Sequence, residues 1–124
     1  MRNYQKYEVW NEAHQVALLI YNQVTPRIPR FEQFGLTSQM KRAACSVPLN
    51  IAEGCGRNSE KDFVHFLDMS LGSAHELEYC LILIKDLGYL DSDKFELLSK
   101  KMNSIKAMLI TLIKLIRIKG TQRP

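Results

Sequence analysis

The fold of this chain is decided by residues 35–57, which read G-L-T-S-Q-M-K-R-A-A-C-S-V-P-L-N-I-A-E-G-C-G-R. Read as one helix, the stretch places apolar and small side chains on one face, suited to close contact with neighbouring helices. We expect this helix at about Leu36–Glu53. It should kink at Pro48, which lacks the N–H that bonds to the carbonyl of Ala44. The apolar face consists of Met40, Ala43, Ala44, Val47 and Ile51.

A second face of the same helix carries an unusual line of polar residues. Their spacing places them on one side of the helix over roughly four turns. Most of them are short side chains, whereas a solvated helix face usually carries long charged ones. Two explanations are open: a polar network inside the bundle or at a subunit interface, or a binding surface. The line consists of Ser38, Arg42, Ser46, Asn50 and Glu53.

Three further stretches have helical periodicity, and Pro and Gly residues separate them. We expect helices at about Glu8–Val24, Glu60–Leu87 and Asp93–Ile118. Four antiparallel helices with short connections predict an all-α, up-down four-helix bundle. A chain of 124 residues suffices for one core, so we expect a single domain over 1–124 with its ordered core at about 8–119.

Glycine and capping residues mark the ends of these helices. Gly54 stands where a left-handed residue commonly closes a helix, and Asn58 or Ser59 should cap the next one. Gly72, in the middle of the third helix, costs about 1 kcal/mol of helix propensity, which indicates that another helix crosses closely there. The third helix has the clearest heptad, at Phe63, Leu67, Ser70, Ala74, Leu77, Leu81 and Ile84; the fourth repeats it at Leu98, Met102, Ile105, Leu109, Leu112 and Ile116.

The last part of the fourth helix is apolar on more than one side. Between Met108 and Ile118 only Thr111, Lys114 and Arg117 are polar, and they form one thin line. We therefore expect another subunit to cover the second face of this helix. No stretch contains 18 uncharged apolar residues, so we expect no membrane span.

Charge is spread unevenly along the chain, whose formal net charge is +4. Residues 58–95 carry three Lys or Arg against eight Asp or Glu, whereas residues 96–124 carry seven against one. Either an acidic helix packs beside a basic one, or the basic residues form a surface for a polyanion. We see no interleaving of aromatic and basic residues of the kind found in single-strand-binding proteins.

As a hypothesis, a basic surface binds structured RNA or DNA through the phosphate backbone, without reading sequence. The loop at 54–57 offers a phosphate cradle, against which stands the simpler explanation of a helix end. The candidate contacts are Lys41, Arg42, Arg57, Lys106, Lys114 and Arg117, with Lys100, Lys101 and Lys119 as further cations of the fourth helix.

No motif indicates catalysis, a metal or a cofactor. Asp62 and His65 have the spacing of a di-iron helix, but the second copy that such a site needs is missing. His75 and Glu76 begin like a zinc-protease helix, but Tyr79 occupies the place of the second His. We expect no cofactor, no metal and no enzyme activity.

The three cysteines, Cys45, Cys55 and Cys80, form no C-x-x-C pair. They have no base nearby in the sequence, and no secretory signal precedes them. We expect reduced, mostly buried thiols in a cytoplasmic protein. The polar residues 1–7 and the tail at 120–124 should be disordered.

The core A-A-x-S-x-P-x-N-I-A-E-G at Ala43–Gly54 resembles a known bacterial family. With G-S-A-H-E-L-E at 72–78 and D-L-G-Y-L at 86–90, it is similar to the four-helix bundle proteins encoded in the intervening sequence of some 23S rRNA genes. The resemblance covers about Val9–Leu90. The accessory protein of diversity-generating retroelements is a more distant relative of that family. The family-typical positions are Gln39, Arg42, Ser46, Pro48, Asn50, Glu53, Gly54 and Arg57.

The resemblance implies an up-down bundle that assembles as a homopentamer and has a basic surface proposed to bind nucleic acid. For the retroelement relative it implies a reverse transcriptase partner. A second hypothesis is therefore a protein–protein adaptor or scaffold for a partner enzyme such as a reverse transcriptase. Gln39, Ser46, Asn50 and Glu53 are the candidates for the polar network or subunit interface.

Overall fold

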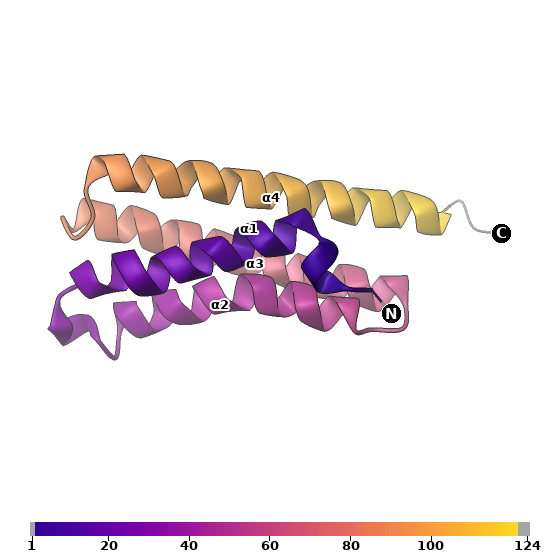
Figure 1. The fold of residues 1–124 in the computed structure, drawn as a ribbon, viewed down its shortest axis with the longest axis horizontal. Helices are drawn as coiled ribbons and strands as arrows, with labels where there is room; N and C mark the ends of the chain where they lie inside the picture. The colour runs from indigo at the N-terminus through magenta and orange to yellow at the C-terminus, as the bar shows by residue number, and fades with distance from the viewer. Residues whose placement is uncertain (1, 122–124) are drawn as a thin grey trace.

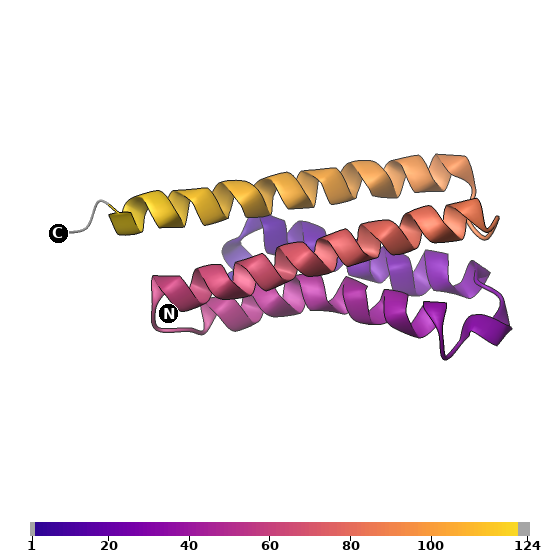
Figure 2. The ribbon, with the colours of Figure 1, turned by 180° about the vertical axis from the view of Figure 1, so that it is seen from behind.

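The computed structural model describes residues 2–121 and confirms an all-α, up-down bundle of four helices (Figure 1). Seen from behind, α3 lies between α2 and α4, and α1 lies on the far side (Figure 2). The helices are α1 (Glu8–Leu19), α2 (Leu36–Cys55), α3 (Glu60–Asp86) and α4 (Ser92–Thr121), and a short 3-10 turn at Tyr4–Lys6 precedes them.

The first helix is shorter than predicted. After α1 the backbone widens into a π turn at Ile20–Val24 and then tightens into a 3-10 turn at Thr25–Arg27. Thr25 Oγ1 donates to the Tyr21 carbonyl at 3.1 Å, and Pro26 supplies no N–H to continue the helix. With 12 residues, α1 cannot cover the whole of α4, which has 30.

Two predictions about helix ends have opposite outcomes. Ser59 caps α3, as predicted, because its Oγ accepts from the Asp62 N–H at 3.0 Å. The prediction for Gly54 is wrong, since Gly54 is a buried residue inside α2 and has no positive φ. Among the described residues only Gly88, in the turn between α3 and α4, takes the left-handed conformation, with φ +83°.

The N-terminal residues are better ordered than predicted. Asn3 Oδ1 accepts from the Gln5 N–H at 3.0 Å and begins the 3-10 turn. The Tyr7 ring then packs edge-on against Phe63 of α3, with ring centroids 6.1 Å apart. At the other end, Gly120 and Thr121 belong to α4, and the predicted tail at 122–124 lies outside the described residues.

One hydrophobic core joins the four helices, and its residues are those that the periodicity predicts. The stripes of α1 and α2 and the heptad of α3 are fully buried. The heptad of α4 is buried only as far as Leu109; its last two members, Leu112 and Ile116, are half-buried. The largest side chains that are completely buried are Phe63, Ile20, Met40, Ile51, Leu67, Leu77, Leu81, Ile84, Leu98, Met102, Ile105 and Leu109.

The contact between α2 and α3 is the closest in the bundle's interior. A Cβ placed on Gly54 would lie 2.9 Å from Phe66 Cβ and 3.3 Å from the Phe63 carbonyl, so only glycine fits. About two turns before Gly54 on α2, the Val47 carbonyl accepts from Oγ of the fully buried Ser70 of α3 at 2.7 Å. The close crossing predicted at Gly72 is wrong: no described atom would lie within 4 Å of a Cβ there.

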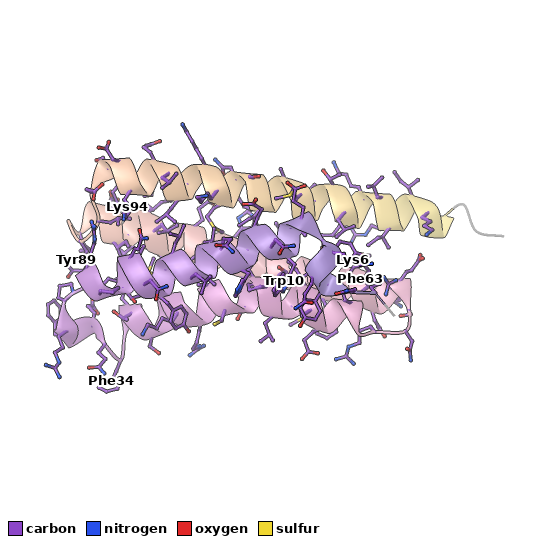
Figure 3. All side chains as sticks on the ribbon, in the orientation of Figure 1. Lys6, Trp10, Phe34, Phe63, Tyr89 and Lys94 are labelled. Carbon is purple, nitrogen blue, oxygen red and sulfur yellow. The ribbon has the colours of Figure 1, made fainter. Side chains whose placement is uncertain are left out.

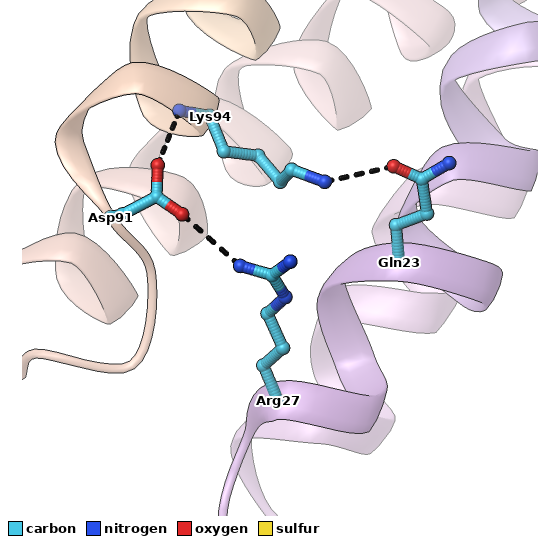
Figure 4. Close-up of polar contacts among 4 residues, drawn as sticks. All are labelled: Gln23, Arg27, Asp91 and Lys94. Carbon is cyan, nitrogen blue, oxygen red and sulfur yellow. Dashed lines mark hydrogen bonds and ion pairs between the residues drawn. The ribbon is translucent and has the colours of Figure 1, made fainter.

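A set of polar contacts fixes the start of α4 to the end of the first helical segment (Figure 4). Asp91 caps α4 by accepting from the Lys94 N–H at 2.7 Å, and its other carboxylate oxygen pairs with Arg27 at 3.1 Å. Lys94 Nζ in turn donates to Gln23 Oε1 at 2.9 Å. These contacts lie at the end of the bundle that holds the connection between α1 and α2 and the connection between α3 and α4 (Figure 1).

The far half of α4 is covered much less completely. It runs past the turn between α2 and α3 (Figure 1), and Leu115 and Ile118 are 59% and 54% exposed. A mostly apolar groove of about 310 Å³ separates it from the start of α1, with Tyr7, Val9 and Leu112 in its walls. That another subunit covers this face stays a prediction. None of the described helices is both long enough and apolar enough to cross a membrane.

Candidate nucleic-acid interface

The polar line of α2 satisfies itself largely within the helix. Ser46 Oγ donates to the Arg42 carbonyl, and Asn50 Nδ2 donates to the Ser46 carbonyl, both at 2.8 Å. Glu53 pairs with Arg57 one turn later at 3.4 Å, and not with Arg42. Gln39 and Arg42 are exposed, and the Arg42 guanidinium has no carboxylate partner among residues 2–121.

Lys41 lies on the flank of α2 that faces α1. Its ammonium group lies 5.1 Å from the centre of the Tyr21 ring. The Tyr21 hydroxyl lies 3.4 Å from Cys45 Sγ, one turn further along α2. The hydrogen bond with Cys45 raises the pKa of Tyr21, and burial adds to the effect. The tyrosine therefore stays neutral and offers its ring to the cation.

Arg57 belongs to a cluster of arginine and phenylalanine at the turn between α2 and α3. Its guanidinium carbon lies 4.6 Å from the centre of the Phe66 ring. The guanidinium carbon of Arg2 lies 4.1 Å from the centre of Phe63, and Arg2 Nη1 donates to the Arg57 carbonyl at 3.3 Å. The N-terminal arm thus brings a second arginine to a predicted binding residue.

Of the two explanations for the loop at 54–57, the structure supports the helix end and not the phosphate cradle. Gly54 and Cys55 are buried in α2, so their backbone N–H groups belong to that helix. At the start of α3 the Asp62 N–H is occupied by Ser59, and Glu60 and Asp62 add negative charge there. Anions are disfavoured at such an end despite the helix dipole.

The three cations predicted on α4 lie in different environments. Lys106 Nζ contacts Glu78 Oε2 at 2.6 Å, and the Lys106 side chain is only 17% exposed. Arg117 pairs with Asp68 at 3.1 Å beside a groove of about 400 Å³ between α3 and α4. Lys114 is exposed and has no carboxylate partner within the described part of the chain.

The six predicted cations therefore do not form one surface in a single protomer. Lys41, Arg42 and Arg57 lie on and just beyond α2, whereas Lys106, Lys114 and Arg117 lie on α4. Helices α2 and α4 are diagonal in the bundle and do not touch within the described residues. The acidic α3 packs beside the basic α4. Of the two explanations for the uneven charge, the structure therefore supports an acidic helix beside a basic one.

Sequence reasoning missed the aromatic residues around the N-terminal arm. The Tyr4 and Trp10 rings meet edge to face with centroids 5.0 Å apart, and Trp10 stacks on His14 at 5.1 Å with 10° between the planes. In the sequence Arg2 precedes Tyr4, and Lys6 lies between Tyr4 and Trp10. Contrary to the prediction, basic and aromatic residues do interleave here, and this alternation was the signal that could have revealed them.

The thiols are mostly buried, as predicted, with Cys45 the exception. Burial raises the pKa of the Cys55 and Cys80 thiols, which makes them poor nucleophiles. Cys45 is exposed beside Tyr21. Among residues 2–121, no three His, Cys, Asp or Glu side chains lie close enough together to hold a metal ion.

Comparisons with known proteins agree with the bundle and with the motif of α2. The family model described as 23S rRNA-intervening sequence protein matches residues 5–111. The crystal structure of a protein of unknown function of the S23 ribosomal protein family, from Bacteroides thetaiotaomicron, is similar with a TM-score of 0.79 and 27% sequence identity; the match covers 86% of this chain and 98% of that one. No curated protein matches the chain. Neither the family nor this structure is described as an enzyme. The chain belongs to the 23S rRNA-intervening sequence protein family.

Proposed function

We propose that this protein is a homo-oligomer that binds structured RNA or DNA through phosphate contacts, without reading sequence and without catalysis. The observation that carries the proposal is that the exposed Arg42 and Lys114 and the half-buried Lys41 have no carboxylate partners among the described residues, although the chain has 13 acidic residues. Cations that are free of protein carboxylates can exchange their counterions for phosphates.

Oligomerisation supplies what one protomer lacks. A single protomer offers a few cations on diagonal helices, whereas a ring of copies repeats each of them around an axis. Repetition raises the overall affinity for a long polyanion without new contacts in any one subunit. The family resemblance suggests five copies, in the cytoplasm of a bacterium.

The far half of α4 supports self-association. Ile110, Leu115 and Ile118 are exposed large apolar residues on this helix, and Leu115 lines the apolar groove at the start of α1. Exposed apolar surface of this kind marks contact sites in soluble proteins. Leu115→Glu should therefore lower the mass in solution, measured by light scattering. Leu49→Glu on α2 is the matched control, because Leu49 is 57% exposed against 59% for Leu115. An unchanged mass in Leu115→Glu would contradict this interface.

The nucleic-acid role is tested by binding to structured RNA and duplex DNA across a salt series. We expect an affinity that falls steeply with salt, with a slope that counts the phosphate contacts. Arg42→Gln should weaken binding and flatten the slope by about one contact. Lys106→Gln should not change the slope, because Lys106 is held by Glu78. A folded oligomer that binds neither nucleic acid at low salt would overturn the proposal.

The second candidate function is a scaffold for a partner protein such as a reverse transcriptase. Phe31 and Phe34, in the connection between α1 and α2, favour it, because they are 81% and 91% exposed. Phe34 projects from this end of the bundle (Figure 3). Aromatic side chains that are this exposed are typical anchors of protein interfaces. Binding of a reverse transcriptase that is lost in Phe34→Ser, by a protein that binds no nucleic acid, would favour the scaffold.

A further inference from the structure

Four aromatic rings follow one another along α1 and the N-terminal arm. We call Tyr4, Trp10, His14 and Tyr21 the aromatic stripe. Tyr4 contacts Trp10, and Trp10 stacks on His14, with centroids 5.0 Å and 5.1 Å apart. None of the four is fully buried, and Tyr21 is 40% exposed.

Helical register places the stripe on one flank of α1. Trp10 and His14 are four residues apart and so lie on the same side of α1, and Tyr21 follows seven residues later in the π turn at Ile20–Val24. That flank faces α2, because Tyr21 contacts both Lys41 and Cys45 of that helix. Figure 3 labels Lys6 and Trp10 on the N-terminal arm and α1.

Cations lie at both ends of the stripe. Arg2 precedes Tyr4 by two residues in the N-terminal arm, and its Nη1 donates to the Arg57 carbonyl at 3.3 Å, while the two guanidiniums lie over Phe63 and Phe66. Lys6 is exposed in the same arm. At the other end Lys41 lies over Tyr21 at 5.1 Å. Positive charge therefore borders the rings on either side.

The acidic residues of α1 lie on its opposite flank. Glu8 lines the groove that α1 forms with α4, and Glu12 follows one turn later. On α2, Glu53 is paired with Arg57 at 3.4 Å. Of these three carboxylates only Glu53 lies on the side of the stripe, and it is paired with Arg57, one of the four cations Arg2, Lys6, Lys41 and Arg57.

Rings bordered by cations are the chemistry that recognises unpaired nucleotides. Bases stack on aromatic side chains when no opposite strand pairs with them, and the cations follow the sugar–phosphate backbone. A duplex keeps its bases stacked inside and offers only phosphates to the same surface. The stripe therefore distinguishes single-stranded segments from double-stranded ones.

We propose that the aromatic stripe binds unpaired nucleotides, with bases on Trp10 and Tyr21 and phosphates on Arg2, Lys6, Lys41 and Arg57. This inference rests on the proposed nucleic-acid function and names the segment that the protein prefers, such as a loop in a structured RNA. Two of the predicted phosphate contacts, Lys41 and Arg57, acquire a common site in this way. The stripe also gives the N-terminal arm a function.

Trp10 is the single tryptophan of the chain, so its fluorescence reports on this site alone. The probes are a short oligothymidylate and a blunt DNA duplex of the same length, each titrated into the full-length protein. Oligothymidylate should quench Trp10, whereas the duplex should bind with much less quenching. Bound oligothymidylate should also slow the reaction of the exposed Cys45 thiol with a thiol reagent, because Cys45 adjoins Tyr21.

Two variants separate the stacking of bases on aromatic rings from the electrostatic attraction of phosphates to cations. Trp10→Leu should weaken oligothymidylate binding by about fivefold or more, the smallest loss expected for one base stack, and leave duplex binding nearly unchanged. Tyr21→Leu should have a similar effect and serves where Trp10→Leu does not fold. Phe34→Leu is the control, because Phe34 is an exposed aromatic residue outside the stripe.

The outcomes distinguish the two proposals. Equal binding of single strand and duplex, with no change of Trp10 fluorescence, would overturn the aromatic stripe and leave the phosphate-binding function standing. Absence of binding to both probes would overturn both. Trp10 fluorescence that follows protein concentration without any nucleic acid would show that copies of this chain cover the stripe, and that too would overturn it.

Discussion

The contact between α2 and α3 and the contact between α3 and α4 are built differently, although each of these helices buries one apolar face. Between α2 and α3 the backbones approach until only glycine fits at Gly54, and the buried Ser70 joins the two helices. Between α3 and α4 two ion pairs lie at the helix edges, Lys106 with Glu78 and Arg117 with Asp68. The first contact depends on shape, and the second on flexible side chains.

The difference between the two contacts follows from the way α1 covers α2 and α4. The 12-residue α1 packs against α2 but leaves the far half of the 30-residue α4 without a neighbour on one side. Apolar residues such as Leu115 then face solvent in the protomer. The protein thus combines a closely packed half with a half that leaves apolar side chains exposed.

The largest effect should come from breaking the close contact of α2 and α3. Gly54→Ala puts a Cβ 2.9 Å from Phe66 Cβ, and neither helix can move without losing its packing. We expect the free energy of unfolding in urea to fall by about 1–3 kcal/mol.

Gly72→Ala is the matched control for Gly54→Ala. It places the same methyl group on an exposed helical position with no described atom within 4 Å. The free energy of unfolding should rise by about 0.5–1 kcal/mol, because alanine loses less conformational entropy than glycine in a helix. Equal effects at the two positions would contradict the difference between the two contacts.

The sequence predicted the elements well and the contacts between them poorly. Periodicity located the buried stripes because one face of each helix must leave water. It could not decide which glycine lies at a close approach between helices. Gly54 was expected to end a helix, but it lies at the close approach of α2 and α3. Gly72 was expected at a helix crossing, but no neighbouring helix of the described residues approaches it. Local rules carry no information about the neighbouring helix.

The candidate site was predicted only in part, for the same reason. The cations could be named from the sequence, but their partners could not, because Glu78 and Asp68 lie on another helix than Lys106 and Arg117. The polar line of α2 closes mostly on itself through bonds that span one helical turn. In the aromatic stripe only Tyr4 belongs to the residues that were expected to be disordered, and periodicity alone did not join it to Trp10, His14 and Tyr21.

The next effect should come from the half-buried ion pair of α3 and α4. Lys106→Met keeps the apolar stem but leaves Glu78, which is 28% exposed, without its cation. We expect a loss of about 1.5 kcal/mol in the free energy of unfolding. Arg117→Met removes a pair whose side chains are 60% and 47% exposed, and should cost only about 0.2–1 kcal/mol. A larger loss in Arg117→Met than in Lys106→Met would contradict this order.

A smaller effect is expected from the buried hydrogen bond between α2 and α3. Ser70→Ala removes the bond to the Val47 carbonyl but leaves that carbonyl in the helical ladder. The free energy of unfolding should fall by about 1 kcal/mol. Ser46→Ala is the control, since Ser46 bonds only to the carbonyl of Arg42 in its own helix. It should change stability by at most about 0.5 kcal/mol. A neutral Ser70→Ala would show that shape alone holds the two helices together.

The smallest effect concerns the anchored start of α4 and depends on pH. The bond from the Lys94 N–H lowers the pKa of Asp91 below its ordinary value of 3.8, and Arg27 lowers it further. Because the folded pKa is the lower one, the charged Asp91 stabilises the fold above pH 3.8, and this contribution is lost as the pH falls through the folded pKa. Asp91→Asn keeps a capping side chain without the charge, so its melting temperature should lie below that of the parent at pH 7 and converge with it at acid pH. A gap that persists in acid would mean that the carboxylate acts at the start of α4 by shape and not by charge.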